Sequence, residues 1–453
     1  MRLLQGTALV SCTATLDFQL ALSVAMPVNL PPPPPNTTPP AVLNPFVWAA
    51  LFIAIMAIGI GHTLLTWPKG TSTHTVWFWL RLVFFPAMAW LVLLGLRLLY
   101  VEQETDRIRA ELDQWNEDRD KAVRFAQEPL ALLAATYRCG IGCGDVAETI
   151  AGGRQTISVQ QPSAGLTAIP HTRLVALEGL TLQARYEACF VELLDRLDDA
   201  LCALPACAPL EVYLQGGASA SIPRAPNHVD DKELDAEPVD IFAIWQRCWA
   251  GFGHRAAPTH ALPTHDSMMT LDTWLDAYAG RELEKFVLII AVQLHATPPA
   301  RSAEAAVALL LGWAPLAQRN SLPIDALLHR PVATKDGAVV DRLSTSLLWG
   351  RAEAAEVTGL WHAKLDVAIK TEVVKAACDI GMAACRIDGL TGVHDVERAL
   401  GDAGAAEPWL TLALAAEHAG RTGEAQTVVT CCPTLCMAVA QASMSTHDAG
   451  PQG

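Results

Sequence analysis

The chain has 453 residues and a formal net charge of −15, from 47 acidic and 32 basic side chains. This acidic balance argues against nucleic-acid binding and against adhesion of the polar part to anionic lipid. The residues after position 100 are numerous enough for one large domain or two lobes.

The N-terminal residues 1–43 are predicted to be a disordered, proline-rich segment. Met1–Ala25 resembles a secretion signal only superficially, because Asp17 interrupts its apolar part. The run Pro31–Pro35 favours a polyproline II spacer that leads into the next segment.

Two apolar runs predict a transmembrane hairpin over residues 44–100. Phe46–Thr66 and Val76–Leu99 are each long enough, as helices, to cross a hydrocarbon core roughly 30 Å thick. The short connection Trp67–Thr75 allows only an antiparallel pair. Two helices are too few for a pore, so we interpret them as a lipid-bilayer anchor.

The flanks of both runs fit this interpretation. Arg81 and Arg97 lie near helix ends, where they can extend toward the headgroups. Pro86 is expected to kink the second helix, and Ala57 with Gly61 to give it a small-residue contact surface. Aromatic side chains stand where interfacial belts are expected: Trp67, Trp77, Trp79 and Tyr100.

Basic residues predict the orientation of the hairpin. The connection carries Lys69 alone, whereas five basic residues follow the second run, and the positive-inside rule places that side in the cytoplasm. We therefore expect a multi-pass protein of the inner membrane with its large domain in the cytoplasm. The five residues are Arg107, Arg109, Arg119, Lys121 and Arg124.

A charged segment follows the membrane region. Glu102–Tyr137 has apolar residues at helical spacing and favourable i,i+4 charge pairs, so residues 101–138 are predicted to form a stalk helix. Residues 139–172 are polar and rich in glycine, which is typical of a linker or a surface excursion.

Residues 173–445 alternate strand-like and helical patterns, which predicts a layered α/β domain. Phe286–Leu294 has the β-branched composition of a central strand covered on both faces. Residues 446–453 are predicted to be a disordered tail. The other expected elements are strands at Leu174–Leu177 and Leu210–Leu214 and helices at Leu180–Ala203 and Asp240–Gly251.

Three stretches between Phe286 and Met444 resemble β-ketoacyl synthases and other members of the thiolase-like superfamily. Ser302–Gly312 is similar to the family's GEGAAALLL strand. Ala399–Ala419 resembles its GHTLGAAG segment with the helix that follows. Thr427–Thr430 and Cys436–Ala442 are similar to its last antiparallel strand pair. The resemblance implies a thiolase-like fold.

The sequence departs from the family pattern at the positions where active members carry their reactive residues. Gly401 and Asp402 stand where active condensing enzymes have a histidine, and Cys431–Pro433 replaces the glycine-rich turn between the last strands. Cys207 is the nearest imitation of the acyl-accepting thiol, but Pro209 places it in a loop. The resemblance therefore implies the fold without condensation activity, and we assign no catalytic residue.

The chain as a whole resembles accessory proteins of bacterial type VI secretion systems. The resemblance lies in the combination of a membrane hairpin, a charged stalk and a thiolase-like domain without its reactive residues. In those systems adaptors bring toxic effectors to the secretion spike. The resemblance implies a protein partner, either an effector or a component of the secretion machinery.

Other candidate chemistry has a plainer explanation in each case. Cysteines 139, 143, 431, 432 and 436 lack the usual zinc spacing, so free thiols are favoured over a metal site. Loop histidines 254, 260 and 265, with Asp266, are favoured as solvated side chains. Asp395, after His394, is expected to cap a helix. We therefore assign no metal and no cofactor.

One aromatic pair is the candidate partner-binding site. Trp245 and Trp249 lie one helical turn apart; in the core they would be packing residues, and exposed they would anchor a partner.

Two functions from different classes remain open. The first is a membrane-anchored, non-enzymatic adaptor, and the second is an acyl-transferring or other thiolase-like enzyme with an unrecognised active site. A central pocket lined by a cysteine and histidines would favour the enzyme, and an exposed apolar patch would favour the adaptor.

Overall fold

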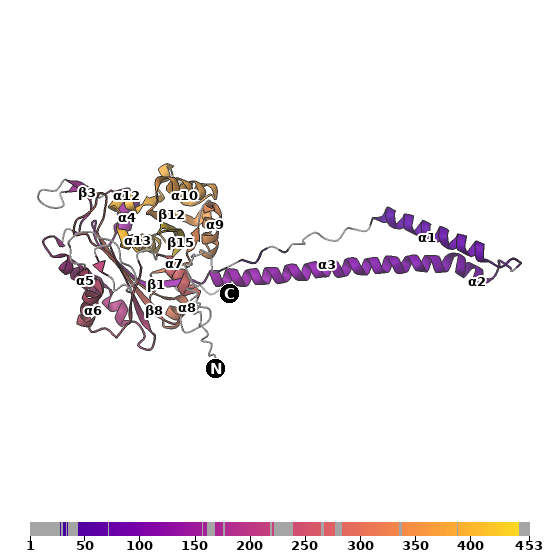
Figure 1. Ribbon diagram of the computed structural model, residues 1–453, viewed down its shortest axis with the longest axis horizontal. Coiled ribbons are helices and arrows are strands. Elements are labelled where there is room, and N and C mark those ends of the chain that lie inside the picture. The colour runs from indigo at the N-terminus through magenta and orange to yellow at the C-terminus, as the bar shows by residue number, and fades with distance from the viewer. Residues whose placement is uncertain are drawn as a thin grey trace, which may run out of the picture. The chain divides into compact units, whose positions relative to one another are not determined.

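A computed structural model describes residues 28, 30–32, 34, 44–70, 72–155, 157–160, 168–174, 177–217, 220–221, 239–263, 267–276, 283–334, 338–386 and 388–443. The predictions for the N-terminal segment 1–43 and the tail 446–453 lie almost wholly outside these residues. The chain forms two compact units, Asn29–Val123 and a second that contains Arg124–Gly453. We call them the hairpin unit and the α/β unit (Figure 1).

The hairpin unit contains the two apolar helices that the sequence predicts. α1 spans Pro45–Thr66, and Asn44 caps it by accepting a hydrogen bond from the Phe46 N–H. The second rod is continuous and consists of α2 (Val76–Trp79), a π-helical turn η1 (Leu80–Phe84) and α3 (Phe85–Ala126). Both rods are long and apolar enough to cross a membrane.

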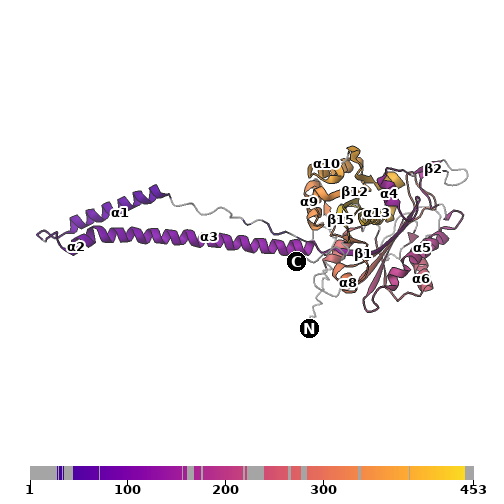
Figure 2. The same ribbon diagram turned by 180° about the vertical axis from the view of Figure 1, so that it is seen from behind.

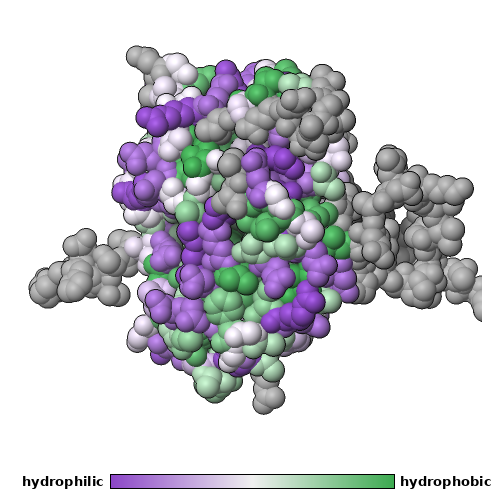
Figure 3. All heavy atoms as spheres, turned by 90° about the vertical axis from the view of Figure 1, so that its left-hand side faces the viewer, coloured by the Kyte–Doolittle hydropathy of each residue, from purple (hydrophilic) through white to green (hydrophobic). Residues whose placement is uncertain are grey.

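Exposed apolar side chains are concentrated in the hairpin unit. Large hydrophobic residues from Phe46 to Tyr100 are exposed around both rods. In the described part of the α/β unit, such residues are scattered, and one face shows hydrophilic and hydrophobic residues interspersed (Figure 3). The scattered exposed hydrophobic residues of the α/β unit are Val159, Leu180, Val191, Val340, Val367 and Leu390. Among the described residues, the exposed apolar surface is therefore concentrated on the hairpin.

The two rods pack at a glycine that the sequence analysis did not select. A Cβ on Gly59 would lie 2.8 Å from Pro86 Cβ, so only glycine allows this approach. Gly61 has no atom within 4 Å of the corresponding position, and Ala57 is exposed. The contact predicted at Ala57 and Gly61 is therefore wrong, because the second rod approaches α1 at Gly59, through Pro86.

The π-helical turn next to Pro86 leaves one carbonyl without its helical partner. The Phe85 N–H donates to Leu80 O, and Pro86 has no N–H to offer Arg81 O. The buried Thr63 hydroxyl of α1 lies 3.2 Å from Arg81 O and 2.8 Å from Gly59 O. The Thr63 hydroxyl thus lies between a carbonyl of its own rod and one of the other rod, and it links the two backbones.

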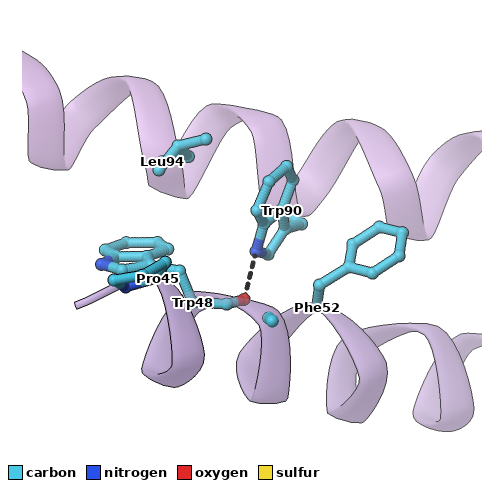
Figure 4. A pocket seen from close by; sticks show the side chains of 6 residues that line it. Pro45, Trp48, Phe52, Trp90 and Leu94 are labelled. Carbon is cyan, nitrogen blue, oxygen red and sulfur yellow. Dashed lines mark hydrogen bonds between the residues drawn. The ribbon is translucent and has the colours of Figure 1, made fainter. Parts of the chain in front are cut away.

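Near its first turn, α1 meets α3 through aromatic side chains. Trp90 Nε1 donates to Trp48 O at 3.2 Å, and the rings of Phe52 and Trp90 pack edge to face with centroids 5.1 Å apart. An open groove lies here, lined also by Pro45 and Leu94 (Figure 4).

The charged helix is shorter than predicted. α3 ends at Ala126 instead of Tyr137, and Leu130–Cys139 forms the strand β1. Pro129 cannot continue a helix, and Leu130–Leu133 are buried consecutively, as in a strand covered on both faces. The α/β unit therefore includes residues from Arg124, which the sequence analysis assigned to the stalk.

The α/β unit continues with alternating strands and helices. Its first part comprises α4 (Val146–Ala151), β2 (Ser158–Gln160), β3 (Ile169–His171), α5 (Leu182–Cys202), β4 (Leu210–Gly216), β5 (Ala220–Ser221), β6 (Val239–Asp240), α6 (Ile241–Phe252), β7 (Thr259–Ala261), α7 (Met269–Leu275), β8 (Phe286–Gln293), β9 (Ala305–Trp313) and α8 (Ala314–Arg319). Its second part comprises β10 (Ala326–Leu328), β11 (Val332–Thr334), α9 (Val339–Trp349), β12 (Val357–Ala363), α10 (Val367–Asp379), α11 (Ala383–Arg386), β13 (Val393–Asp395), α12 (Val396–Leu400), α13 (Glu407–Thr422), β14 (Ala425–Cys431) and β15 (Leu435–Ala442).

One large sheet has the strand order β13-β12-β14-β15-β10-β1-β9-β8-β4-β7, with β11 paired to β15. The order contains a duplication. The series β4, β7, β8, β9 and the series β12, β13, β14, β15 each have three parallel strands followed by one antiparallel strand, in the same spatial order. α7 and α13 occupy equivalent places, each before the third strand of its series.

Three buried clusters define the layers of the unit. α5 and α6 cover one half of the sheet, and α9 and α10 cover the other half (Figures 1 and 2). The middle cluster contains residues of α7, α13 and both halves of the sheet. In β8, Leu288 and Ile290 face α5 and α6, whereas Val287 and Ile289 face the middle layer. The predicted doubly covered strand is confirmed.

Most of the expected elements of this unit are confirmed as α5, β4, α6, β8, β9, α13 and the antiparallel pair β14 and β15. The strand expected at Leu174–Leu177 is wrong for its described residues. Leu174 and Leu177 are buried, but neither lies in a strand, because Thr172 makes only an isolated bridge to Ala303 before the chain turns toward α5.

Candidate functional site

The candidate site lies where the two halves of the α/β unit meet, in the middle layer. β8 ends there at Gln293, β12 ends before Lys364, and α13 begins at Glu407. Ligands of layered α/β folds commonly bind beyond the carboxyl ends of parallel strands. We call this group of side chains the carboxyl site, and it includes Asp402.

Two carboxyl groups share the centre of the carboxyl site. Glu407 is completely buried, and burial followed by the neighbouring Asp402 raises its pKa well above the usual value. Burial alone would raise the pKa of Asp402 too, but a hydrogen bond with Glu407 and one from the Gly404 N–H, at 2.8 Å, lower it. The shifts are therefore opposed: the surroundings favour the protonated form of Glu407 and the charged form of Asp402.

A lysine in a strained conformation balances that charge. Lys364 Nζ lies 3.9 Å from Asp402 Oδ1, with about a quarter of its side chain exposed. Its backbone has a φ of 56°, a left-handed value that is uncommon for residues other than glycine. Residues in such uncommon backbone conformations occur frequently at functional sites.

Close backbone packing fixes the loop that carries Asp402. Gly401 has a φ of 103°, and a Cβ there would lie 2.7 Å from Ser302 O. The Gln293 side chain lies against Gly404 and accepts a hydrogen bond from the Ala405 N–H at 3.2 Å. Gly401 is thus required by the backbone, which is a structural reason for a glycine at this point.

A cysteine of the turn between β14 and β15, Cys432, borders the carboxyl site. Burial raises the pKa of Cys432 to about 11, although Lys364 opposes the shift. Ser267 Oγ donates to Cys432 O at 3.4 Å, which ties the turn to the start of α7. A thiol with this pKa is protonated at neutral pH and is a poor nucleophile.

The sequence analysis names Asp402 and Cys432 only as departures from the family pattern, and it does not name Lys364, Glu407 or Gln293. Each of the missed residues ends a strand or starts a helix, and its neighbours in the site come from distant parts of the sequence. An acidic residue in the first turn of a helix is ordinarily explained by the helix dipole. The signal that could have identified Glu407 is its place at the start of an apolar helix, among residues that become wholly buried.

Three histidines lie near Trp361 but not in the carboxyl site. The rings of His394 and Trp361 have centroids 4.3 Å apart, and those of His418 and Trp361 5.4 Å. Burial lowers the pKa of both His362 and His394 to about 4, so both are neutral. Asp395 accepts a hydrogen bond from the Arg398 N–H at 2.9 Å, which confirms it as a helix cap.

The tryptophan pair lies in the core. Trp245 is 1% exposed and Trp249 is 9% exposed, and both pack in the cluster formed by α5 and α6. The role of partner anchor requires exposed indoles, so the structure corrects that assignment in favour of the packing alternative. Both indoles belong to the one buried face of α6, which also carries Ile241, Ile244 and Cys248.

The described cysteines are free thiols. Of the loop histidines, His260 is exposed and stacks on Tyr213, His254 packs against Trp249, and His265 with Asp266 lies outside the described residues. The expected solvated cluster is therefore wrong for His254, whose side chain is 7% exposed.

Solved structures of ketosynthases have a similar fold. The ketosynthase from module 1 of the bacillaene synthase of Bacillus amyloliquefaciens has a TM-score of 0.48 at 12% identity, and the match covers 71% of this chain and 77% of that chain. A β-ketoacyl synthase from Burkholderia phymatum has a TM-score of 0.45 at 12% identity, with 70% and 100% covered. These likenesses concern fold alone. No family model and no curated protein matches the chain.

Proposed function

We propose that this protein is a membrane-anchored, non-enzymatic binding protein whose thiolase-like body receives another protein. The observation that carries the proposal is the composition of the carboxyl site. The buried Glu407 carboxyl, Asp402 and Lys364 occupy the meeting point of the two halves, with Lys364 Nζ 3.9 Å from Asp402 Oδ1, and burial raises the pKa of the bordering Cys432 thiol. This set supplies no activated nucleophile for acyl transfer.

The hairpin unit supports the anchoring part of the proposal. Two rods with apolar surface on all sides, packed through Gly59 and Pro86, have the length and composition of membrane-spanning helices. Basic residues after the second rod favour a cytoplasmic α/β unit in the inner membrane.

The partner we propose is an effector of a type VI secretion system or a component of its machinery. The support is the sequence resemblance to accessory proteins of those systems, joined to a body without an activated thiol. Affinity purification of the cross-linked full chain is expected to recover such a protein. The hairpin unit alone, used as bait, is the control for membrane neighbours.

Acyl transfer is tested directly by intact mass. The full chain in detergent is incubated with long-chain acyl-coenzyme A and with an acyl carrier protein thioester, and we expect no change in its mass. An acyl adduct on Cys432 or Cys436 would overturn the non-enzymatic proposal, whichever protein copurifies.

The alternative, an enzyme with a different set of residues, is favoured by one observation. Lys364 has a left-handed backbone conformation, and its Nζ contacts Asp402. Asp402 and Glu407 have pKa values shifted in opposite directions, and carboxyl pairs of this kind occur in acid–base sites. Turnover that disappears in Lys364→Met while the fold is retained would establish this alternative.

A further inference from the structure

A group of potential metal ligands lies at the outer layer of the α/β unit, away from the carboxyl site. Asp198 and Cys202 lie one helical turn apart near the end of α5, and His254 follows the end of α6. The ligand atoms of the three residues all lie within 4.8 Å of one another, and no other such group occurs among the residues that the structure describes.

The spacing of the three atoms fits a small divalent ion. His254 Nε2 lies 3.4 Å from Asp198 Oδ1, and Cys202 Sγ lies 3.9 Å from the same oxygen. In a tetrahedral zinc site with bonds of about 2.0–2.3 Å, neighbouring ligand atoms are separated by roughly 3.3–3.8 Å. These two separations lie in or near this range, and Cys202 Sγ lies within 4.8 Å of His254 Nε2, so side-chain movements of about 1 Å or less bring the three atoms to this geometry.

The environment of His254 gives a second, independent indication of a metal site. Its side chain is 7% exposed, and Nε2 is buried without a hydrogen-bond partner among the described residues. A buried imidazole nitrogen without a partner costs free energy unless something binds it. Nε2 faces Asp198 Oδ1 without making a hydrogen bond, which is the arrangement expected for a nitrogen that shares an ion with that oxygen.

The surroundings hold the His254 ring in place. The ring stacks on Phe252 with an interplanar angle of 10°, and its centroid lies 5.0 Å from that of Trp249. Trp249 Nε1 donates to Arg255 O at 3.1 Å, and an Arg255 N–H donates to Pro205 O at 2.8 Å. These bonds fix the loop after α6 against the end of α5, so the ligands are positioned before any ion arrives.

We propose that Asp198, Cys202 and His254 bind a Zn²⁺ ion, with water as the fourth ligand. Imidazole, thiolate and carboxylate are the donors that zinc prefers, whereas magnesium and calcium prefer oxygen donors alone. Cys202 is exposed and Asp198 is about half exposed, so the fourth position opens to solvent. Binding releases the Cys202 thiol proton to water. The ion ties α5 to the loop after α6.

Cobalt(II) tests the proposal with a readout specific for the thiolate. The full chain in detergent, reduced and freed of metal, is titrated with Co²⁺ and then with Zn²⁺. We expect one equivalent to bind, with a thiolate-to-cobalt charge-transfer band that Zn²⁺ abolishes. Cys202→Ser is expected to lose the band, and His254→Gln to weaken binding by at least about 100-fold.

Cys207→Ser is the matched control, because Cys207 is also exposed, lies just beyond α5 and is not a ligand. It should bind cobalt as the unaltered chain does. Cys202 is exposed, so its serine variant should fold even if His254→Gln does not. An unaltered chain without the band at saturating cobalt, or a Cys202→Ser variant that keeps it, would overturn the proposal.

Discussion

Burial and a neighbouring carboxylate together determine the charge of Glu407. Its pKa is raised well above the usual range of a glutamate, so the protonated form is favoured in the folded chain at pH values where the unfolded chain releases the proton. A raised carboxyl pKa contributes stability that is complete below the unfolded pKa and is lost as the pH rises toward the folded pKa. Glu407 therefore makes the α/β unit less stable at pH 8 than at pH 5.

Glu407→Gln should remove this pH dependence. The amide keeps the shape and can still donate to Asp402, but it has no proton to lose, so each pH unit above the unfolded pKa favours the variant by about 1.4 kcal/mol. We expect the melting temperature of the variant, relative to the unaltered chain, to rise from pH 5 to pH 8. The exposed Glu372→Gln is the control. A difference that is constant with pH would contradict the assignment of the proton.

A second buried charge at the residue scale is Arg330, which is 0% exposed. Its guanidinium donates to Asp272 Oδ1 at 2.8 Å and to Leu275 O at 2.9 Å, and it lies over the Phe125 ring. Burial raises the pKa of Asp272 to about 7, although Arg330 opposes the shift. Arg330 thus ties α7 to the segment between β10 and β11.

Arg330→Met should destabilise the α/β unit by about 3–5 kcal/mol at pH 8, because Asp272 is then left as a buried charge without its partner. The loss should be smaller at pH 5, where Asp272 is protonated in the folded chain and the raised pKa no longer costs stability. Chemical denaturation at the two pH values measures the difference. An equal loss at both would show that Arg330 acts through packing alone.

At the scale of elements, the hairpin depends on one close approach. Gly59→Val would place side-chain atoms where Pro86 lies, and overpacking of this kind costs about 1–3 kcal/mol. Gly61→Val is the control, since it meets no atom within 4 Å. Energy transfer between fluorophores near Asn44 and Leu94, followed through an SDS titration, should show earlier opening for Gly59→Val only. Equal behaviour of both variants would exclude this contact.

Element prediction succeeded where one physical signal dominated. The apolar runs before Tyr100 and the doubly covered strand at Phe286 have patterns that few alternatives match. The helical spacing of the charged residues before Pro129 predicts that the stalk helix continues through Tyr137, but Leu130–Cys139 forms a strand. The strand is set by Pro129 and by pairing with β9 and β10, far along the chain. The local sequence pattern around a strand does not indicate pairing with strands so far along the chain. It also does not indicate that Lys364 and Asp402 lie close together in the fold.

At the scale of the whole molecule, the duplication explains why the candidate site is central. Two series of strands with the same order place α7 and α13 in equivalent positions, and both helices contribute to the middle layer. The equivalence of the two series lies in their strand order and in the parallel and antiparallel pairing of their strands.

The native cysteines provide a test of the side on which the α/β unit lies. Cys202, Cys207 and Cys378 are exposed on that unit. If the positive-inside orientation holds, a membrane-impermeant maleimide should leave them unlabelled in spheroplasts and label them after permeabilisation. A Cys202→Ser, Cys207→Ser, Cys378→Ser variant should lose most of the second signal, which ties the label to these positions. Labelling before permeabilisation would place the unit on the outer side, where the proposed cytoplasmic partner could not reach it.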